Sequence, residues 1–259
     1  MDYFLLIIRR FISFEENQEG KAMKIAVISD LHIGNGDEAD RFGHDDHEFL
    51  RFLKFMEANF EKIILLGDIF ETLTGRAYGK RMNELRRCFQ AHPEVSKRLV
   101  GNRRKYIYLH GNHDMLAAEA FSSVSEHFMS VGGRTILFTH GHVFDRISHN
   151  ARGLAEWFVW LGGHLLRSGR RKTFDFLRGL DDHFLGNRID SKKCDFRSRA
   201  MNAARRMGID VMVTGHSHAG GFADFGDGLF LNSGACLEGN FQYLAMDLAA
   251  MNYSYNSTW

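Results

Sequence analysis

Apolar, β-branched runs recur along this chain, and each ends at a glycine or at a polar motif. They cover residues 25–29, 63–66, 106–109, 135–139 and 211–214. Short apolar runs bounded by turn residues are typical of strands that are buried on both faces. The pattern therefore predicts a sheet-based core.

Apolar residues at helical spacing fill the segments between the early strands, at positions 49, 50, 52, 53 and 56 and again at 85, 88 and 89. Such alternation of strand and helix predicts a layered α/β fold with functional residues at the C-terminal ends of the strands. After Gly215 the chain consists of short segments punctuated by glycine, which is typical of antiparallel hairpins. We therefore expect mixed sheets packed together.

Residues 146–207 interrupt this alternation with two apolar helical stretches, one around Trp157 and Trp160 and one around Phe174 and Phe176. We expect a helical insertion between two strands. One interpretation is a pair of core helices. The other is a lid whose aromatic face meets an acyl chain or a membrane while its arginines meet phosphate.

The charge of the chain is unevenly distributed. The formal net charge is +1, yet residues 146–206 carry 14 Lys and Arg against 6 Asp and Glu, a local net of +8, which leaves −7 for the remainder. A basic segment inside an acidic body indicates an anionic substrate or surface.

The cysteines and the N-terminal apolar run bear on two further possibilities, thiolate sites and a membrane span. Cys88, Cys194 and Cys236 lie far apart without a C-x-x-C pair, so we expect neither disulfides nor a thiolate zinc site, and a reducing compartment. The first apolar run, residues 3–8, is too short for a membrane span. Residues 1–22 are therefore expected to be a leader, with a short interfacial helix as the alternative, and residues 23–259 to form the domain.

Five polar motifs follow the predicted strands. Each is weak evidence alone, because an Asp at a strand end is often a cap or a turn former. Together they supply the oxygen and imidazole ligands that a pair of divalent metal ions requires, and a carboxylate such as Asp68 can bridge both ions. The motifs are Asp30-Leu31-His32, Gly67-Asp68, Gly111-Asn112-His113-Asp114, His140-Gly141-His142 and Gly215-His216-Ser217-His218.

In kind and order these motifs resemble the signature of the calcineurin-like metallophosphoesterases. The resemblance runs from about residue 24 to residue 248 and implies a four-layer α/β/β/α sandwich around two sheets. It also implies two sets of metal ligands that share Asp68. One set is Asp30, His32, Asp68 and His218, and the other is Asp68, Asn112, His140 and His216.

The implied chemistry is phosphoester hydrolysis by a hydroxide that bridges two metal ions about 3.5–4 Å apart. Mn²⁺ is the ion that we expect, with Fe²⁺ or Zn²⁺ as alternatives, because mixed nitrogen and oxygen ligands suit all three. The leaving group needs a proton or charge stabilisation. His113 is the expected catalytic donor, while Asp114 either orients His113 or braces its loop.

Within the family, the chain is similar to the group around UDP-2,3-diacylglucosamine hydrolase, a pyrophosphatase of lipid A biosynthesis. The similarity lies in residues 29–32, in residues 67–71 and in the basic, aromatic insertion. One departure is His113, where the best-known branch has arginine, and it bears directly on the substrate. The expected substrate contacts are His142, Arg152, Arg167, Arg170 and Arg171.

The expected substrate is therefore a UDP-linked acylated sugar whose pyrophosphate is hydrolysed. The alternatives are a broader phosphodiesterase or phosphomonoesterase acting on nucleotides and, from another class, a scaffold without turnover. Nucleic acid is a disfavoured partner, because the basic segment lacks a recognisable binding module. We expect a cytoplasmic protein that contacts the inner face of the membrane through the insertion or the N-terminal segment.

Overall fold

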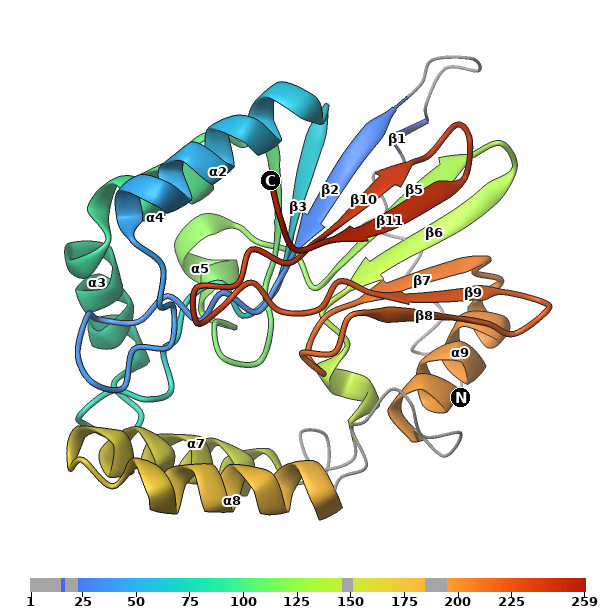
Figure 1. Ribbon diagram of the computed structural model, residues 1–259. Coiled ribbons are helices and arrows are strands. Elements are labelled where there is room, and N and C mark those ends of the chain that lie inside the picture. Colours follow the sequence, from blue (N-terminus) through green and yellow to red (C-terminus); the bar gives the residue numbers. More distant parts are fainter. Residues whose placement is uncertain (1–14, 17–22, 146–150, 185–194) are drawn as a thin grey trace.

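The computed structural model describes residues 15–16, 23–145, 151–184 and 195–259 (Figure 1). Most of the predicted leader, residues 1–14 and 17–22, lies outside the described residues, as do residues 146–150 and 185–194 of the predicted insertion. Within the described residues, no helix has the length and apolar character needed to cross a bilayer.

Three parallel strands form the centre of the first sheet. β2 pairs with β3 in the register Ile25 to Lys62, and β3 pairs with β4 in the register Ile63 to Tyr106. Two antiparallel strands extend this sheet on the side of β2. In sheet order the strands are β11 (Asn252–Asn256), β10 (Tyr243–Asp247), β2 (Lys24–Ile28), β3 (Lys62–Leu66) and β4 (Tyr106–Leu109).

The second sheet mixes parallel and antiparallel pairs. β6, β7 and β9 are parallel neighbours, β5 and β8 flank them in antiparallel pairs, and β1 runs parallel to β5. Over the described residues its strand order is β1 (Glu15–Glu16), β5 (Glu126–Val131), β6 (Arg134–Thr139), β7 (Val211–Thr214), β9 (Leu229–Asn232) and β8 (Gly221–Asp224).

Buried apolar side chains stack the two sheets and the outer helices into four layers. One cluster joins the first sheet to α2 (Asp46–Asn59), α3 (Arg81–Ala91) and α4 (Pro93–Gly101). A second, which includes Val27 and Phe138, fills the space between the sheets. A third packs α9 (Asp195–Met207) on the second sheet. The predicted four-layer α/β/β/α sandwich is therefore confirmed (Figure 1).

Helix α2 shows how the sequence pattern produces a layer. Its N-cap, Asp45, accepts a hydrogen bond from the backbone N–H of Glu48 at 2.9 Å and so satisfies one of the free donors of the first turn. Phe49, Phe52 and Met56 follow at helical spacing and are fully buried against the first sheet. Burial of a side chain of this size contributes roughly 1.5–3 kcal/mol.

The predicted strands agree with the observed ones within one residue, and the apolar positions at helical spacing lie inside α2 and α3. The run at 106–109 coincides with β4 and the run at 211–214 with β7. The glycine-punctuated C-terminal segment forms the antiparallel pairs β8–β9 and β10–β11. The prediction of hairpin-like strands after Gly215 is thus confirmed.

The predicted insertion contains helices of two kinds. α7 (Arg152–Arg167) and α8 (Arg171–Phe184) lie side by side at one end of the molecule, apart from both sheets (Figure 1). Helix α9, in contrast, is itself the outer layer over the second sheet, where Ala200, Met201 and Ala204 are fully buried. The segment that stands off the sandwich therefore ends before α9.

Helix α7 is fastened to the loops that follow β2 and β3. Nε of Arg167 lies 2.6 Å from Oδ2 of Asp37, and Arg81 donates to the carboxylate of Glu156. A Cβ on Gly163 would meet the side chain of Thr74 at 2.9 Å. These contacts hold one face of α7 against the loops that follow the C-terminal ends of β2 and β3.

Among the described residues, the other short helices are α5 (Ala117–Phe121), which follows β4, and the 3₁₀ turn η1 (His142–Phe144), which follows β6. His92, between α3 and α4, joins the helical layer to the loop after β2. Its Nδ1 lies 2.6 Å from Oδ1 of Asp46 and its Nε2 3.2 Å from Oδ2 of Asp40. Burial opposes protonation of His92, but the two carboxylates outweigh burial and raise its pKa.

A group whose pKa is raised by folding stabilises the fold below its unfolded pKa and loses that contribution as the pH rises through the folded pKa. We predict that His92→Gln lowers the free energy of unfolding by about 1 kcal/mol at pH 6, after allowance for solvent screening. The difference should shrink by pH 9. Urea unfolding of both proteins at the two pH values measures it, and an equal deficit at both would contradict the charge-based explanation.

Candidate metal centre

The polar motifs converge at the C-terminal ends of five strands that belong to both sheets. Asp30 follows β2, Asp68 follows β3 and the 111–114 segment follows β4, while His140 follows β6 and His216 follows β7. Because parallel strands end at the same edge of a sheet, motifs far apart in sequence become neighbours.

The backbone at this edge is unusual. Among the described residues, eight other than glycine have a positive φ, and five of these belong to the motifs. A left-handed conformation is rare outside glycine and costs on the order of 1 kcal/mol or more, so its concentration at one edge points to a functional site. The five are Asp30 at 53°, His32 at 47°, Asp68 at 52°, His216 at 67° and His218 at 57°.

The glycines of the motifs make room for the polar side chains. A Cβ on Gly111 would lie 2.1 Å from Oδ1 of Asp68, and a Cβ on Gly215 would lie 2.7 Å from Oδ2 of Asp30. Both distances are far below van der Waals contact. Glycine at these two positions therefore lets the carboxylates approach the backbone of the neighbouring strand ends.

One cluster of donor atoms contains Asp30, His32 and His218. Nε2 of His218 lies 3.2 Å from Oδ1 of Asp30 and 3.3 Å from Nε2 of His32. Potential ligand atoms of all three residues lie within 4.8 Å of one another. Asp30 is fully buried, and its Oδ2 accepts hydrogen bonds from the Ser29 hydroxyl and, at 3.1 Å, from the backbone N–H of His216.

A second cluster contains Asp68, His140 and His216, again with one potential ligand atom each within 4.8 Å of the others. Nε2 of His140 lies 3.1 Å from Oδ2 of Asp68. The same Oδ2 lies 4.0 Å from Nε2 of His32, so Asp68 stands between the two clusters.

The donor atoms fit divalent metal ions. Within the described part of the chain, Oδ1 of Asp30, Oδ1 of Asn112 and Nε2 of His140 are buried and make no hydrogen bond of acceptable geometry, although Asp30 and His140 have the close ionic neighbours given above. Each belongs to a residue predicted as a metal ligand. A buried polar atom without a partner is costly, and coordination by a cation would remove that cost.

The carboxylates and imidazoles of the clusters shift one another's pKa values. Burial disfavours protonation of His140, but the charges of Asp68 and Asp30 outweigh it and raise the pKa of His140 to about 10. Conversely, burial raises the pKa of Asp68, but the neighbouring histidines, above all His140, outweigh burial and hold the pKa well below its usual value. The carboxylate of Asp68 is therefore ionised, as a metal ligand must be.

His113 projects toward the same centre. Its Nε2 lies 3.9 Å from Oδ2 of Asp68, and its Nδ1 lies 2.7 Å from Oε2 of Glu71. Burial lowers the pKa of His113, but the charges of Glu71 and Asp68 raise it to about 9. The protonated ring has two N–H donors, one held by Glu71 and one directed toward the clusters.

Glu71 is a site residue that the sequence reasoning did not select. Its Oε2 accepts from Nδ1 of His113 and, at 3.0 Å, from Nδ1 of His32, while its Oε1 accepts from the backbone N–H of Leu73 at 2.9 Å. One buried carboxylate thus orients a predicted metal ligand and the predicted proton donor. Its place three residues after Asp68 was the available signal.

Asp114 braces the loops. Its carboxylate accepts from the backbone N–H groups of Gly111 at 2.6 Å and Ile69 at 2.9 Å, and from the hydroxyl of Tyr108 at 2.7 Å. Burial, followed by the charge of Asp68, raises its pKa to about 6. Of the two roles expected for Asp114, these bonds match the support of the backbone.

The residues predicted to contact substrate are dispersed. His142 lies beside the second cluster, with its ring 5.7 Å from that of His140, and burial together with the charges of His140 and His216 lowers its pKa to about 3. Arg152 pairs with Glu156 and Arg167 with Asp37. Arg170 and Arg171 are exposed on the connection between α7 and α8 and at the start of α8.

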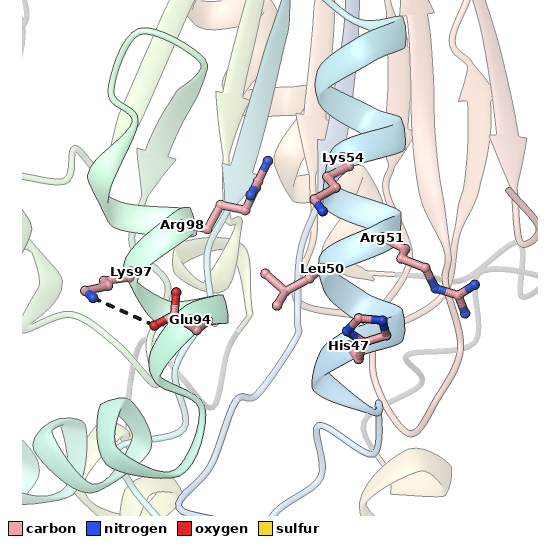
Figure 2. Close-up of a pocket in the computed structure, with 7 residues that line it drawn as sticks. All are labelled: His47, Leu50, Arg51, Lys54, Glu94, Lys97 and Arg98. Carbon is pink, nitrogen blue, oxygen red and sulfur yellow. Dashed lines mark ion pairs between the residues drawn. The ribbon is translucent and has the colours of Figure 1, made fainter.

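A separate groove of about 400 Å³ lies between α2 and α4 (Figure 2). Its cations are largely engaged, because Lys97 pairs with Glu94, Arg98 with Glu57, and Arg51 lies over the ring of Trp259. None of its lining residues belongs to the motifs. The groove is therefore a solvated helical surface and not part of the candidate centre.

Comparison with known proteins agrees with these features. The model of the calcineurin-like phosphoesterase family matches residues 23–220. UDP-2,3-diacylglucosamine hydrolase of Yersinia pseudotuberculosis is 24% identical over 218 residues, which cover 76% of this chain and 82% of the relative. The corresponding protein of Chromohalobacter salexigens is 29% identical over 126 residues, 46% of this chain, so the chain spans about half, 47%, of that relative.

Among solved structures, the phosphoesterase Yfce from E. coli is similar with 15% identity and a TM-score of 0.43, over 91% of this chain and 99% of that one. Vps29 from Chaetomium thermophilum gives 16% identity and a TM-score of 0.42, over 90% and 93% of the two chains.

The close approach at Gly111 gives a direct test of the site geometry. We predict that Gly111→Ala lowers the free energy of unfolding by about 1–3 kcal/mol, because the new Cβ would displace the Asp68 carboxylate, and that it weakens metal binding. Gly101→Ala is the matched control, since nothing lies within 4 Å of its Cβ. At the end of α4, alanine should be neutral or stabilising by about 0.5–1 kcal/mol. Chemical denaturation and metal titration of both variants provide the comparison.

Proposed function

The chain belongs to the calcineurin-like phosphoesterase family, and from this we propose that it hydrolyses the pyrophosphate of a UDP-linked acylated sugar with two divalent metal ions. The predicted class, a metal-dependent phosphoesterase, is confirmed by that membership. The observation that carries the two-metal proposal is the position of Asp68, which shares one donor group with His140 and His216 and another with His32 and His113, beside the group of Asp30, His32 and His218.

The first ion would be held by Asp30, His32, Asp68 and His218. The second would be held by Asp68, Asn112, His140 and His216. With an ion bound, Nδ1–H of His140 would donate to the carbonyl oxygen of Leu66, 2.9 Å away, and the lone pair of Nε2 would be available to the ion. Mn²⁺ is the ion that suits this mixture of carboxylate, amide and imidazole ligands, with Fe²⁺ and Zn²⁺ as alternatives.

The bound ions would polarise the phosphoryl group and make a hydroxide nucleophile accessible near neutral pH. The residues of the chain supply positioning and protons. His113, held by Glu71, is placed to neutralise charge on the phosphoryl oxygens or, when Nε2 carries a proton, to protonate the leaving group. Ser29 and the backbone of His216 hold the Asp30 carboxylate in place.

The choice of substrate is supported by the relatives and by the α7–α8 pair. The matched relatives in Yersinia and Chromohalobacter are named UDP-2,3-diacylglucosamine hydrolases. In this chain α7 and α8 leave large apolar side chains open to solvent, which is not what a pair of core helices does. The exposed side chains are Leu154, Trp157, Phe158, Phe176 and Leu177, with 40–65% of their surface accessible.

An exposed apolar surface next to basic residues suits an acyl chain and the anionic surface of a membrane. We therefore propose that α7 and α8 cover the acyl chains of the substrate at the cytoplasmic face of the membrane. Arg170 and Arg171 lie on the connection between these helices and at the start of α8, where we propose that they contact phosphate, while Arg152, paired with Glu156 on α7, would do so only by leaving that pair. Arg167 is already paired with Asp37 and would fasten α7 to the loop after β2.

The second candidate is a broader phosphodiesterase or phosphomonoesterase acting on nucleotides. The observation that favours it is His113, because a histidine can transfer a proton to many leaving groups whereas an arginine can only stabilise charge.

The two candidates differ in what they release. We predict that the Mn²⁺-loaded protein releases UMP from UDP-2,3-diacylglucosamine, and that Asp68→Asn lowers this rate by at least ~100-fold, since loss of even an outer-shell partner typically costs 10–100-fold. Parallel assays with bis-p-nitrophenyl phosphate and phosphomonoesters separate the candidates. Absence of UMP together with turnover of the small esters would favour the second, and unchanged rates in Asp68→Asn would exclude both.

The role of the exposed aromatic side chains is separable from the chemistry. We predict that Trp157→Ala with Phe158→Ala raises KM for the acylated substrate several-fold, because each Å² of apolar contact that is lost costs about 25 cal/mol of binding free energy. Turnover of bis-p-nitrophenyl phosphate should not change. Phe222→Ala, at an equally exposed phenylalanine on β8, is the control. Equal losses on both substrates would indicate a structural role instead.

A further inference from the structure

Asp145 lies against the second cluster although no motif includes it. It follows the 3₁₀ turn η1, three residues after His142, and its Oδ2 lies 3.2 Å from Nε2 of His216. Both side chains are mostly shielded from solvent, with accessible fractions of 14% and 11%. A carboxylate at this distance from a ring nitrogen is its hydrogen-bond acceptor.

This hydrogen bond decides which nitrogen of His216 carries the lone pair. In a neutral imidazole one nitrogen is a donor and the other an acceptor. When Nε2–H donates to Asp145, the lone pair resides on Nδ1, and only that atom can bind a metal ion. A histidine ligand held through its other nitrogen by a carboxylate is a common arrangement in metal sites.

The segment that carries Asp145 is anchored independently of α7. The carbonyl oxygen of Phe144 accepts from Nε of Arg199 at 2.6 Å, and the ring of Phe144 lies 6.3 Å from that of Phe196 on α9. Phe196 also packs against the ring of His216 at 5.9 Å. The same helix therefore supports both members of the Asp145–His216 pair.

The backbone of His216 explains why such support is useful. Its φ of 67° is left-handed, which is unfavourable for a residue with a side chain. The backbone N–H of His216 donates to Oδ2 of Asp30, a residue of the first cluster, at 3.1 Å. Asp145 holds the ring of His216 through Nε2. Together the two bonds leave the ring little freedom to rotate.

We propose that Asp145 is a positioning residue that fixes the tautomer and orientation of His216 and so presents Nδ1 to the second metal ion. This rests on the proposed function, in which His216 is a ligand of that ion. In this proposal Asp145 acts through His216 and not on the ion or the substrate itself. Its loss should weaken one of the two ions selectively, because the first cluster contains none of the atoms involved.

The test is a titration of the metal-free protein with Mn²⁺, followed by calorimetry, for wild type and for Asp145→Ala and Asp145→Asn. In Asp145→Ala we expect one of the two ions to bind 10–100-fold more weakly, the range typical for loss of such a partner, while the other is unchanged. Asp145→Asn keeps an acceptor oxygen in the same place and should lose less. Asp227→Ala removes an exposed carboxylate paired with Arg205 and is the matched control.

A second measurement does not depend on metal. In ¹⁵N NMR spectra of the metal-free protein, with the His216 signals assigned by comparison with His216→Gln, wild type should show the tautomer protonated at Nε2. Asp145→Ala should show a mixture, and Asp227→Ala the wild-type tautomer. An unchanged tautomer in Asp145→Ala would overturn the inference.

His216→Ala separates the inference from its premise. If His216→Ala weakens one ion and Asp145→Ala weakens neither, the inference alone is wrong. If His216→Ala also leaves both ions bound with wild-type affinity, His216 is not a ligand and the proposed two-metal assignment is wrong. Loss of both ions in Asp145→Ala with wild-type behaviour in Asp145→Asn would indicate general collapse of the site and overturn the selective role.

Discussion

The carboxylate of Asp68 is the group on which the candidate centre depends, because it stands between both donor clusters. Its Oδ2 lies 3.1 Å from Nε2 of His140 and 4.0 Å from Nε2 of His32, and its Oδ1 accepts the backbone N–H of His113 at 2.8 Å. A buried carboxylate must be matched by donors or cations. The surrounding histidines, and the absence of a side chain at Gly111, meet that requirement.

The cost of this arrangement appears in the backbone. Asp68 and four other motif residues adopt left-handed conformations at the ends of otherwise regular strands. The sandwich can sustain such strain because the strands behind it are fully buried and paired on both sides, with Ile64 and Leu66 wholly inaccessible on β3. Rigid strands thus hold the ligands, while the loops after them hold the residues that orient those ligands, such as Glu71 and Asp145.

The helices α7 and α8 differ from α9 in what covers their apolar side chains, although the three are consecutive in sequence. Helix α9 buries Ala200, Met201 and Ala204 and so completes the sandwich. Helix α7 instead meets the site loops through ion pairs and leaves Trp157 and Phe158 exposed. Periodicity alone could not distinguish them, because an apolar helical face looks the same in sequence whether protein or lipid covers it.

The sequence by itself determined the layered α/β fold, the polar motifs and most of the strands, because alternation of apolar runs and glycine is a local signal. No predicted run covers β5. The sequence did not single out Glu71, whose signal was its place three residues after Asp68, and it could not identify Asp145, since a lone acidic residue carries no signal until folding brings it to a histidine from another strand. The tertiary structure alone decided which nitrogen faces which carboxylate, that Asp114 braces backbone, and that Arg167 is occupied by Asp37. These depend on distances between segments far apart in the chain.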